Sequence, residues 1–330
     1  MSKDKGIFRW GIIGPGRIAH KFAQALRAVP GAHLHAVSGR DLSRARDFAR
    51  SYDADYAYDS TEALVKDDNL DAVYIATPHT YHYEQANICL EHGKPVLVEK
   101  PVTVNAGQFQ SLATLAQRKN VFLMEALWTR YLPIYQEIRQ WLNEGRIGEV
   151  RLMTSTFGFK GERDPKGRLF NPQLAGGTLL DIGIYNIAVT HWVMASHPTE
   201  VNTQAWFSHT GVDELLTANL IHANGVVSQF TSTFLTECQN DFWIYGDAGR
   251  IQVRRRFWDA TQASLIIDDH EKTTTRRYRL NGFEYQIEEV VDCVRTGRLE
   301  SSRMTHADSL GIQQTMDRIR AQIGLRYPFE

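Results

Sequence analysis

A chain of 330 residues is too long for one ordinary hydrophobic core and predicts two domains. Its hydrophobic content of 43% and charged content of 23% are those of a soluble globular protein. A net charge of −1 and the absence of any apolar run of roughly 18 residues exclude nucleic acid and membrane as expected partners.

The N-terminal stretch MSKDKGIFRW is short and charged and has no apolar signal-peptide core. The chain has three isolated cysteines, Cys89, Cys238 and Cys293, with no C-x-x-C pair. An odd, sparse count indicates a reducing compartment rather than a disulfide framework or a zinc site. We therefore expect a cytoplasmic protein.

Residues 1–125 alternate strand-like and helical stretches. Apolar runs at 8–14, 33–39, 71–77, 95–100 and 121–126 are separated by helical patterns at 18–29, 42–52, 80–93 and 104–120. Strands that alternate with helices predict right-handed crossovers and a doubly wound parallel sheet. The sequence thus predicts a first, α/β domain over residues 1–125.

The pattern changes in residues 126–330, which we expect to form a second domain. Strand-like runs at 149–159, 199–209, 215–223, 226–235, 241–253, 263–269 and 275–280 lie close together, with turn-like HANG and GDAG between several of them. This spacing predicts a mostly antiparallel sheet. Helices are expected at 178–194, 282–295 and 305–323, and the last two could pack back on the first domain. The arginine-rich runs RRRF and TTTRRYR are interpreted as solvated strand faces.

The first motif, GPGRIA, follows an apolar strand and opens a helix. Gly14 permits a tight turn, Gly16 lets the backbone approach a pyrophosphate, and Ala19 lets helix and strand pack closely. The helix N-terminus at Arg17 and Ile18 offers unpaired N–H groups to the phosphates. The alternative, a purely structural turn, is disfavoured by the alternating strands and helices that follow. We expect a bound dinucleotide.

The end of the second strand, AVSGRD, bears on the choice between NADP and NAD. An NAD site usually places Asp or Glu here, to bind the ribose hydroxyls. Here Ser38 and Arg40 stand near that place, and Arg40 can pair with a 2′-phosphate. Asp41 follows and weakens the argument. We expect NADP, with NAD possible.

The second motif, VLVEKPV, puts Glu99, Lys100 and Pro101 at the end of a strand. In an open α/β sheet, ligands bind outside the carboxyl ends of the strands. Lys100 there can hold a substrate hydroxyl and stabilise negative charge on its oxygen. Position alone leaves open that it is an ordinary surface lysine.

The third motif lies in GGTLLDIGIYNIAVTHW. Asp181 and Tyr185 stand at i and i+4 and share a face on a helix, which pairs a carboxylate with a phenol. Such a pair suits proton transfer, although Tyr185 alone is more often a core residue. The segment 157–170, FGFKGERDPKGRLF, is the expected source of substrate selectivity.

A fourth stretch, TPHTYHYE, contains His79 and His82, but no third ligand of suitable type accompanies them. We therefore expect no metal site. Thr77, Pro78 and His82 are predicted to form the loop after the fourth strand, against the cofactor.

Together, the three motifs in this order resemble the glucose-fructose oxidoreductase / inositol dehydrogenase / MocA family over nearly the whole chain. Many members have histidine at the last position of the third motif. Tyr185 instead resembles the branch of dimeric dihydrodiol dehydrogenases and NADP-dependent xylose dehydrogenases, as do MEALWTRYLP, GFEYQIEEV and MDRIRAQIGLRYP.

This resemblance implies a Rossmann domain, a second α/β domain with a large open sheet, and a homodimer, or dimer of dimers, formed through that sheet. It implies that Lys100 and Tyr185 are catalytic and that Asp181 assists. Trp128 and Arg130 are then expected near the cofactor, with Glu99 beside it. Lys100, Asp181, Tyr185 and Tyr285 are expected at the substrate.

The predicted activity is hydride transfer between NADP(H) and a secondary alcohol carbon of a sugar, such as a pyranose, or of a cyclic vicinal diol. Tyr185 would accept the hydroxyl proton, and Lys100 would hydrogen-bond the same oxygen. Three alternatives stay open: an NADPH-dependent keto-sugar reductase, a non-redox NAD-dependent sugar-processing enzyme, and an NADP(H)-sensing scaffold.

Overall fold

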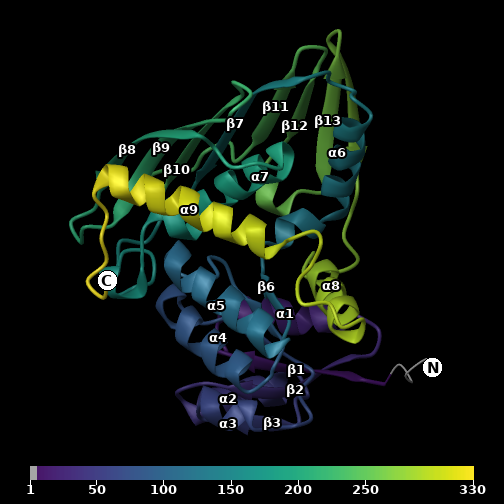
Figure 1. Cartoon of the computed structure of the whole chain (residues 1–330), viewed down its shortest axis with the longest axis vertical. Helices are drawn as coiled ribbons and strands as arrows, with labels where there is room; N and C mark the ends of the chain where they lie inside the picture. The colour runs from purple at the N-terminus through teal and green to yellow at the C-terminus, as the bar shows by residue number, and fades with distance from the viewer. Residues whose placement is uncertain (1–5) are drawn as a thin grey trace. The chain divides into compact units, whose positions relative to one another are not determined.

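The computed structural model describes residues 6–330 and divides into two compact units (Figure 1). Unit 1 contains the chain through Trp128 together with Arg279–Leu310, and unit 2 contains Thr129–Tyr278 and Gly311–Glu330. The units therefore change over at 128, where the sequence suggested 125, and residues 279–310 group with unit 1. The first five residues of the MSKDKGIFRW stretch, part of the basis for expecting no signal peptide, lie outside the described residues.

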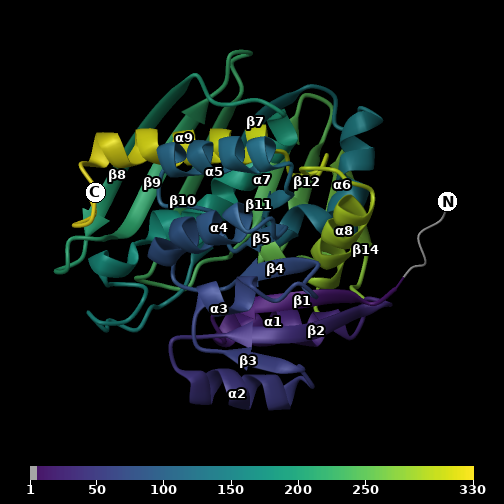
Figure 2. The same cartoon turned by 60° about the horizontal axis from the view of Figure 1, so that its bottom comes forward.

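Unit 1 is built on a six-stranded parallel sheet in the order β3-β2-β1-β4-β5-β6 (Figure 2). The strands are β1 (Phe8–Ile13), β2 (Ala32–Ser38), β3 (Tyr56–Tyr58), β4 (Ala72–Ile75), β5 (Val96–Val98) and β6 (Leu123–Glu125). This order is that of the Rossmann fold, in which ligands bind where the strand order reverses, beside β1 and β4.

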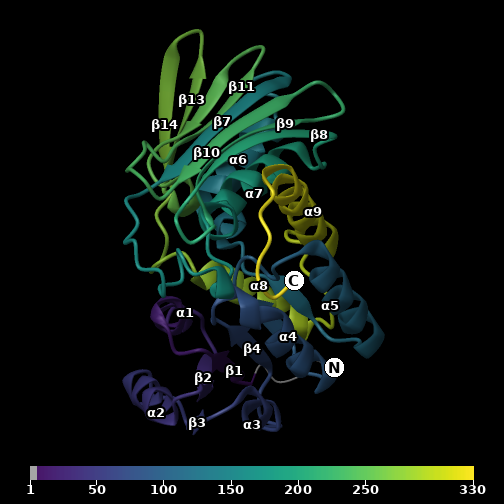
Figure 3. The ribbon, with the colours of Figure 1, turned by 90° about the vertical axis from the view of Figure 1, so that its left-hand side faces the viewer.

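Helices cover both faces of this sheet (Figure 3). Helices α3, α4 and α5 share one buried cluster with β1, β2, β4 and β5, while α1 and α8 contact one another. The helices are α1 (Arg17–Leu26), α2 (Leu42–Ser51), α3 (Thr61–Val65), α4 (His82–Glu91), α5 (Ala106–Lys119) and α8 (Glu284–Arg295). Burial on both faces explains why the strands are continuously apolar.

Side chains fix where several of these helices begin. Asp41 accepts hydrogen bonds from the N–H groups of the first turn of α2, Ser60 does so for α3, and Asn105 for α5. Helix α5 ends at Asn120, whose φ of 58° is the left-handed conformation common after a helix. Helix α1 differs, because its N-cap is Gly16 and no side chain caps it.

Unit 2 contains an eight-stranded sheet in the order β14-β13-β12-β11-β7-β10-β9-β8. Every adjacent pair is antiparallel except β10 and β7. The strands are β7 (Val150–Gly158), β8 (Glu200–Phe207), β9 (Asp213–Ile221), β10 (Val227–Thr233), β11 (Phe242–Gly246), β12 (Arg250–Val253), β13 (Gln262–Ile267) and β14 (His270–Thr275). The predicted fold, a parallel Rossmann sheet followed by a mostly antiparallel open sheet, is confirmed.

One face of the second sheet is covered by helices α6 (Pro133–Asn143) and α7 (Ile184–Met194) and by the part of α9 (His306–Ile323) that belongs to unit 2 (Figure 3). Helix α7 is pinned to β7 by a hydrogen bond from Asn186 to Ser155 (2.8 Å) and to β10 by one between Thr190 and Ser228 (2.7 Å). Among the described residues, the other face has no helix over it.

The sequence predicted one helix over 178–194, but the structure divides it. Residues Leu179–Gly183 form a π-helical turn, and the α-helix proper begins at Ile184. Single π turns within helices are rare and cluster at functional sites. Asp181 therefore lies on the π turn and Tyr185 on the α-helix that follows it.

The turn is held by the buried carboxyl of Asp213, at the start of β9. Its Oδ2 accepts hydrogen bonds from the N–H of Leu179 (2.7 Å) and the hydroxyl of Thr178 (3.2 Å). Gly177 makes this approach possible: its φ is +115°, and a Cβ there would lie 2.0 Å from Asp213 Oδ1. Burial raises the pKa of Asp213 to about 7.

No helix among the described residues is both long enough and apolar enough to cross a membrane.

The raised pKa of Asp213 predicts a pH-dependent stability. Between pH 4 and pH 7 the unfolded chain ionises Asp213 while the folded chain keeps it protonated, so rising pH favours unfolding. The shift from 3.8 to about 7 corresponds to a loss of at most about 4 kcal/mol. Asp213→Asn removes this dependence. Thermal unfolding of both proteins at pH 5 and pH 7.5 tests it, and equal pH slopes would contradict it.

The matched control is Asp247→Asn, the same substitution at an aspartate of the same unit. Asp247 is exposed and pairs with Arg151 at 2.9 Å. Its removal is expected to leave the pH slope between 5 and 7.5 unchanged.

Candidate dinucleotide site and catalytic side chains

The glycine turn after β1 lies directly against the loop after β4. Gly14 has a φ of +89°, and a Cβ on it would lie 2.6 Å from Thr77 Cγ2. Its N–H donates to the carbonyl of Ser38 (2.9 Å), which ties the ends of β1 and β2 together. Gly16 differs, since a Cβ there meets only the carbonyl of Ala76, at 4.0 Å. Only glycine fits position 14, whereas position 16 faces open space.

A cavity of about 630 Å³ opens beside this turn, at the carboxyl ends of β1, β2 and β4. Its volume lies within the usual range for small-molecule sites, about 300–1,000 Å³. Six of the residues predicted to bind the cofactor line it: Gly14, Gly16, Ser38, Arg40, Thr77 and Pro78. The uncapped N-terminus of α1 also faces this region through Gly16, as a phosphate site requires.

Sequence reasoning missed other residues that line the cavity. These are Pro15, Gly39, Arg44, Asp59, Ser60, Thr61, Tyr81 and Gln85, besides Ile13, Asp41 and Ala76. A helical period from Asp41 would have suggested Arg44, because it lies on the first turn of α2. The side chains of Arg17 and Ile18 do not line the cavity, although both begin α1.

Charged side chains of both signs, Arg40 and Arg44 with Asp41 and Asp59, line the end of the cavity near β2. The guanidinium of Arg40 lies 5.2 Å from the ring centroid of Tyr81 and donates to its hydroxyl (3.3 Å). Asp41, in contrast, is occupied: it accepts from the N–H and hydroxyl of Ser43 (2.9 and 2.6 Å). The hydroxyl bond from Ser43 is the main cause of the lowered pKa of Asp41. The carboxylate that weakened the NADP argument serves as the cap of α2.

His82 is fully buried rather than exposed to the cavity. Its Nδ1 lies 2.8 Å from the carbonyl of Pro101, and its Nε2 lies 2.8 Å from the carbonyl of Thr77. Burial lowers the pKa of this imidazole. The ring therefore bridges the loops that follow β4 and β5.

The segment after β5 is supported from beneath by Glu99. The buried Glu99 accepts a hydrogen bond from the hydroxyl of Tyr74 (2.5 Å) and one from the N–H of Lys100 (3.2 Å). Burial raises the pKa of Glu99. The peptide bond between Lys100 and Pro101 is cis, and Lys100 is half-buried. Glu99 thus fixes the backbone from which the Lys100 side chain projects.

Trp128, the last residue of the first stretch of unit 1, is buried among residues of that unit. The ammonium of Lys21 lies 3.8 Å from its ring centroid and 4.6 Å from that of Phe283. The two rings lie 4.9 Å apart. Tyr285, also in unit 1, accepts from the N–H of Arg279 (3.2 Å), and the Arg279 guanidinium lies 5.0 Å from its ring. Lys21 was not foreseen from the sequence.

The remaining predicted residues belong to unit 2. Asp181 is buried and pairs with Arg168 at 2.7 Å, within the segment 157–170 that the sequence analysis linked to selectivity. Tyr185 is buried, with its ring 5.8 Å from that of Phe157 and 6.4 Å from that of Trp258. Arg130 is also buried in unit 2. Arg168 could not be assigned from the motif, because it lies outside that stretch of sequence.

The strand order, the glycine turn and the cavity define a dinucleotide-binding protein. Residues 8–127 match the model of the oxidoreductase family GFO_IDH_MocA, described as having an NAD-binding Rossmann fold, and residues 135–252 match the family's C-terminal domain. The chain belongs to the GFO/IDH/MocA family, which confirms the resemblance found in its motifs. It is an NAD(P)-dependent oxidoreductase.

Known relatives agree over the full length. Trans-1,2-dihydrobenzene-1,2-diol dehydrogenases from Danio rerio and Xenopus tropicalis are 37% and 35% identical, over 97% of this chain and 98% and 99% of theirs. A crystal structure of KijD10, a 3-ketoreductase from Actinomadura kijaniata, in complex with NADP and TDP-benzene has a TM-score of 0.86. It is 25% identical, over 96% of this chain and 98% of its own.

The two glycines of the turn give a matched pair of variants. Gly14→Ala places a Cβ against Thr77 at a φ of +89°, so we expect a lower melting temperature and loss of NADPH binding. Gly16→Ala meets no such obstacle and should keep its stability, but its methyl group blocks the approach of a pyrophosphate. NADPH fluorescence titration and thermal unfolding measure both effects. Unchanged NADPH affinity in Gly16→Ala would contradict the placement.

Proposed function

We propose that this protein transfers a hydride between NADP(H) and a secondary alcohol carbon of a sugar, such as a pyranose, or of a cyclic vicinal diol. The observation that carries the proposal is Lys100, half-buried at the carboxyl end of β5 and held by the buried Glu99. The names of the relatives, a trans-1,2-dihydrobenzene-1,2-diol dehydrogenase and a 3-ketoreductase crystallised with NADP and TDP-benzene, support this substrate class.

NADP is the proposed cofactor, although NAD fits the same turn. Arg40 and Arg44 line the cavity where β2 ends, and the hydroxyl of Ser38 is buried beside them. The competing carboxylate of Asp41 is taken up as the cap of α2. Two guanidinium groups, with the Asp41 carboxylate engaged as a cap, favour a 2′-phosphate; the Asp59 carboxylate, which follows β3 and accepts from the hydroxyl of Ser60, also lines the cavity.

Bound NADP(H) supplies the hydride donor or acceptor. The protein's own contribution begins with Lys100, whose ammonium stabilises negative charge on the substrate oxygen as its proton leaves. Glu99 is the positioning residue, because it binds the N–H of Lys100 and Tyr74 at once. Because the backbone at Lys100 is held, the positions that its ammonium can take relative to the substrate are limited.

Tyr185 is the proposed proton acceptor in oxidation, as the phenolate, and the proton donor in reduction, as the phenol. Its ring is buried beside those of Phe157 and Trp258, which limits its movement. Asp181 assists on the same segment, and Arg168 neutralises its charge within the unit. Such positioned proton transfer typically contributes about 10²–10⁴-fold to the rate.

Keto-sugar reduction is the second candidate, favoured by the likeness to the 3-ketoreductase. It differs only in direction and uses the same residues. A non-redox reaction or an NADP(H)-sensing role would give no net change in absorbance at 340 nm, which separates both from either redox activity.

The first experiment follows absorbance at 340 nm with NADP or NAD against a panel of aldoses, inositols and cyclic diols, then with NADPH against keto-sugars. Lys100→Ala and Tyr185→Phe are each expected to lower kcat at least 10²-fold while NADPH affinity stays within about threefold. Because the two groups are proposed to act on one oxygen, the double variant should be little worse than the poorer single variant.

Lys94→Ala is the matched control, since this lysine binds the carbonyl of Asp67 and lies away from the cavity. It is expected to keep full kcat. Full activity of Lys100→Ala would overturn the catalytic assignment, and strictly additive losses would separate the roles of the two residues.

Cofactor preference is tested by Arg40→Gln and Arg44→Gln. Losing one charge-assisted hydrogen bond costs about 1.5–3 kcal/mol, so KM for NADP should rise about 10- to 100-fold while KM for NAD changes little. Arg46→Gln, on the exposed side of α2, is the control. If the KM ratio of the two cofactors is the same in all four proteins, neither arginine reads the 2′-phosphate.

A homodimer, or dimer of dimers, formed through the uncovered face of the second sheet completes the proposal. That face has exposed or half-buried uncharged residues: Thr154, Trp206, Thr217, Asn219, Gln229, Thr231, Trp243 and Tyr245. Aromatic enrichment with few charges is typical of an interface centre. Sedimentation equilibrium should then give twice, or four times, the chain mass of 37.6 kDa.

We also propose a cytoplasmic location, supported by three unpaired cysteines, all of which should titrate as thiols in the denatured protein without a reductant. We likewise propose that residues 1–125 bind the cofactor and that residues 126–330 bind substrate and form the dimer.

A further inference from the structure

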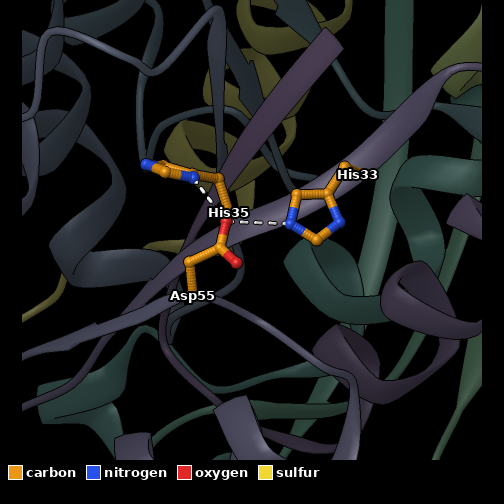
Figure 4. Close-up of side chains that lie close together, drawn as sticks. All are labelled: His33, His35 and Asp55. Carbon is orange, nitrogen blue, oxygen red and sulfur yellow. Dashed lines mark hydrogen bonds and ion pairs between the residues drawn. The ribbon is translucent and has the colours of Figure 1, made fainter. Parts of the chain in front are cut away.

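A cluster of two histidines and one aspartate lies in unit 1, outside the residues that line the dinucleotide cavity. Asp55 Oδ2 is 3.0 Å from His33 Nε2 and 2.8 Å from His35 Nδ1 (Figure 4). The three atoms all lie within 4.8 Å of one another. One carboxylate oxygen and two imidazole nitrogens, three atoms that can each bind a metal, therefore lie side by side.

The backbone brings these side chains together. His33 and His35 are two residues apart on β2, and Asp55 directly precedes β3, with its N–H bound to the carbonyl of His35 (3.0 Å). The β1–β2 register runs from Trp10 opposite Leu34 to Gly11 opposite Ala36, so His35 is an extra residue in β2. Bulges of this kind re-aim a side chain and are over-represented near functional sites.

A second layer of polar groups supports the cluster. The other nitrogen of His35, Nε2, lies 3.0 Å from Asp67 Oδ2, on a side chain that is only 6% exposed. Asp67 also accepts from the hydroxyl of Tyr58 (3.1 Å) and the N–H of Asn69 (2.9 Å). Metal-bound histidines almost always donate their second N–H to such a carboxylate, which fixes the ring and its tautomer.

We propose that His33 Nε2, His35 Nδ1 and Asp55 form a binding site for a divalent transition metal of the zinc type, with Asp67 as the supporting carboxylate. Imidazole nitrogens select such metals over Mg²⁺ and Ca²⁺, which prefer oxygen ligands. In a tetrahedral zinc site with bonds of about 2.1 Å, neighbouring ligand atoms lie about 3.4 Å apart. The two oxygen–nitrogen separations, 3.0 and 2.8 Å, are shorter than this, and the two nitrogens lie within 4.8 Å of each other, so binding of the ion requires the Asp55 carboxylate to move away from both rings.

Charge and access also fit the site. Asp55 supplies a carboxylate oxygen 3.0 and 2.8 Å from the two imidazole nitrogens. Arg9 is the β1 neighbour of His33 in the register, and the carboxylates of Asp55 and Asp67 offset its charge. The side chains of His33 and Asp55 are 35% and 48% exposed, which leaves the fourth position to water.

The site stands apart from the dinucleotide cavity. His33 and His35 lie near the start of β2, whereas the cavity is lined by Ser38 at its end, and none of the cluster residues lines it. From the sequence, no metal site was expected, either at His79 and His82 or at the cysteines, and His33, His35 and Asp55 were not singled out. The metal here would join β2 to the start of β3, independently of the proposed reaction.

The test is isothermal titration of Zn²⁺ into the chelator-treated, full-length protein, with Mg²⁺ in a parallel titration. We expect one Zn²⁺ per chain, no Mg²⁺ uptake and a higher melting temperature with Zn²⁺. His33→Ala should abolish the stoichiometric binding, and Asp67→Asn should weaken it about 10- to 100-fold. Zinc-induced stabilisation should disappear in His33→Ala.

His92→Ala is the matched control, because His92 is an exposed histidine of the same unit outside the cluster. It is expected to bind Zn²⁺ as the unaltered protein does. Since His33 is partly exposed, its replacement is expected to leave the fold intact, which thermal unfolding without metal verifies. Zinc binding that is absent, or that is equal in His33→Ala and the unaltered protein, would overturn the proposal. In that case the cluster is a hydrogen-bonded link between β2 and β3.

Discussion

The dinucleotide site depends on the close contact of two backbone segments at the ends of β1 and β4. Gly14 lies so near Thr77 that no side chain fits between them, and its N–H is used by the carbonyl of Ser38. Gly16 is the N-cap residue of α1, which no side chain caps, and a Cβ on Gly16 would meet only the carbonyl of Ala76, at 4.0 Å. Because this tight turn fixes the backbone, the N-terminus of α1 and the carboxyl ends of the strands both lie at the cavity.

A second constraint extends this contact to the proposed catalytic lysine. His82 joins the carbonyls of Thr77 and Pro101, and Glu99 holds the N–H of Lys100. A neutral imidazole has one N–H for two carbonyl oxygens, so one of the two contacts is unsatisfied unless the ring is protonated. Burial lowers the pKa of His82, and the hydrogen bonds to the carbonyls of Pro101 and Thr77 raise it in part. The loops after β4 and β5 are thus coupled through one buried ring.

Local patterns in the sequence were sufficient to predict the fold and much of the cavity. The strands alternate with helices at regular spacing, and Gly14, Gly16, Ser38 and Arg40 lie within one short motif or at a strand end. Contacts between segments far apart in sequence were not predictable in this way. Arg168 reaches Asp181 from a loop, and Asp67 supports His35 across 32 positions.

Two further differences have local physical causes. Asp41 looked like a ribose ligand, but a residue just before a helix is drawn to cap it, and the hydroxyl of Ser43 completes that bond. The helix predicted over 178–194 begins as a π turn, and its first N–H, that of Leu179, is bound by Asp213 from β9. Periodicity in a single segment carries no information about such a partner.

The composition of unit 1 has a consequence for how the chain is made. Its residues through Trp128 are synthesised first, but Arg279–Leu310 of the same unit come after nearly all of unit 2. Until then the carbonyls of Gly6 and Lys21 lack Arg295 and Asn281, and α1 lacks its contact with α8. During translation, the nucleotide-binding unit therefore cannot complete its fold until most of the second unit has been synthesised. A gene fragment that stops at 128 would encode an unfinished domain.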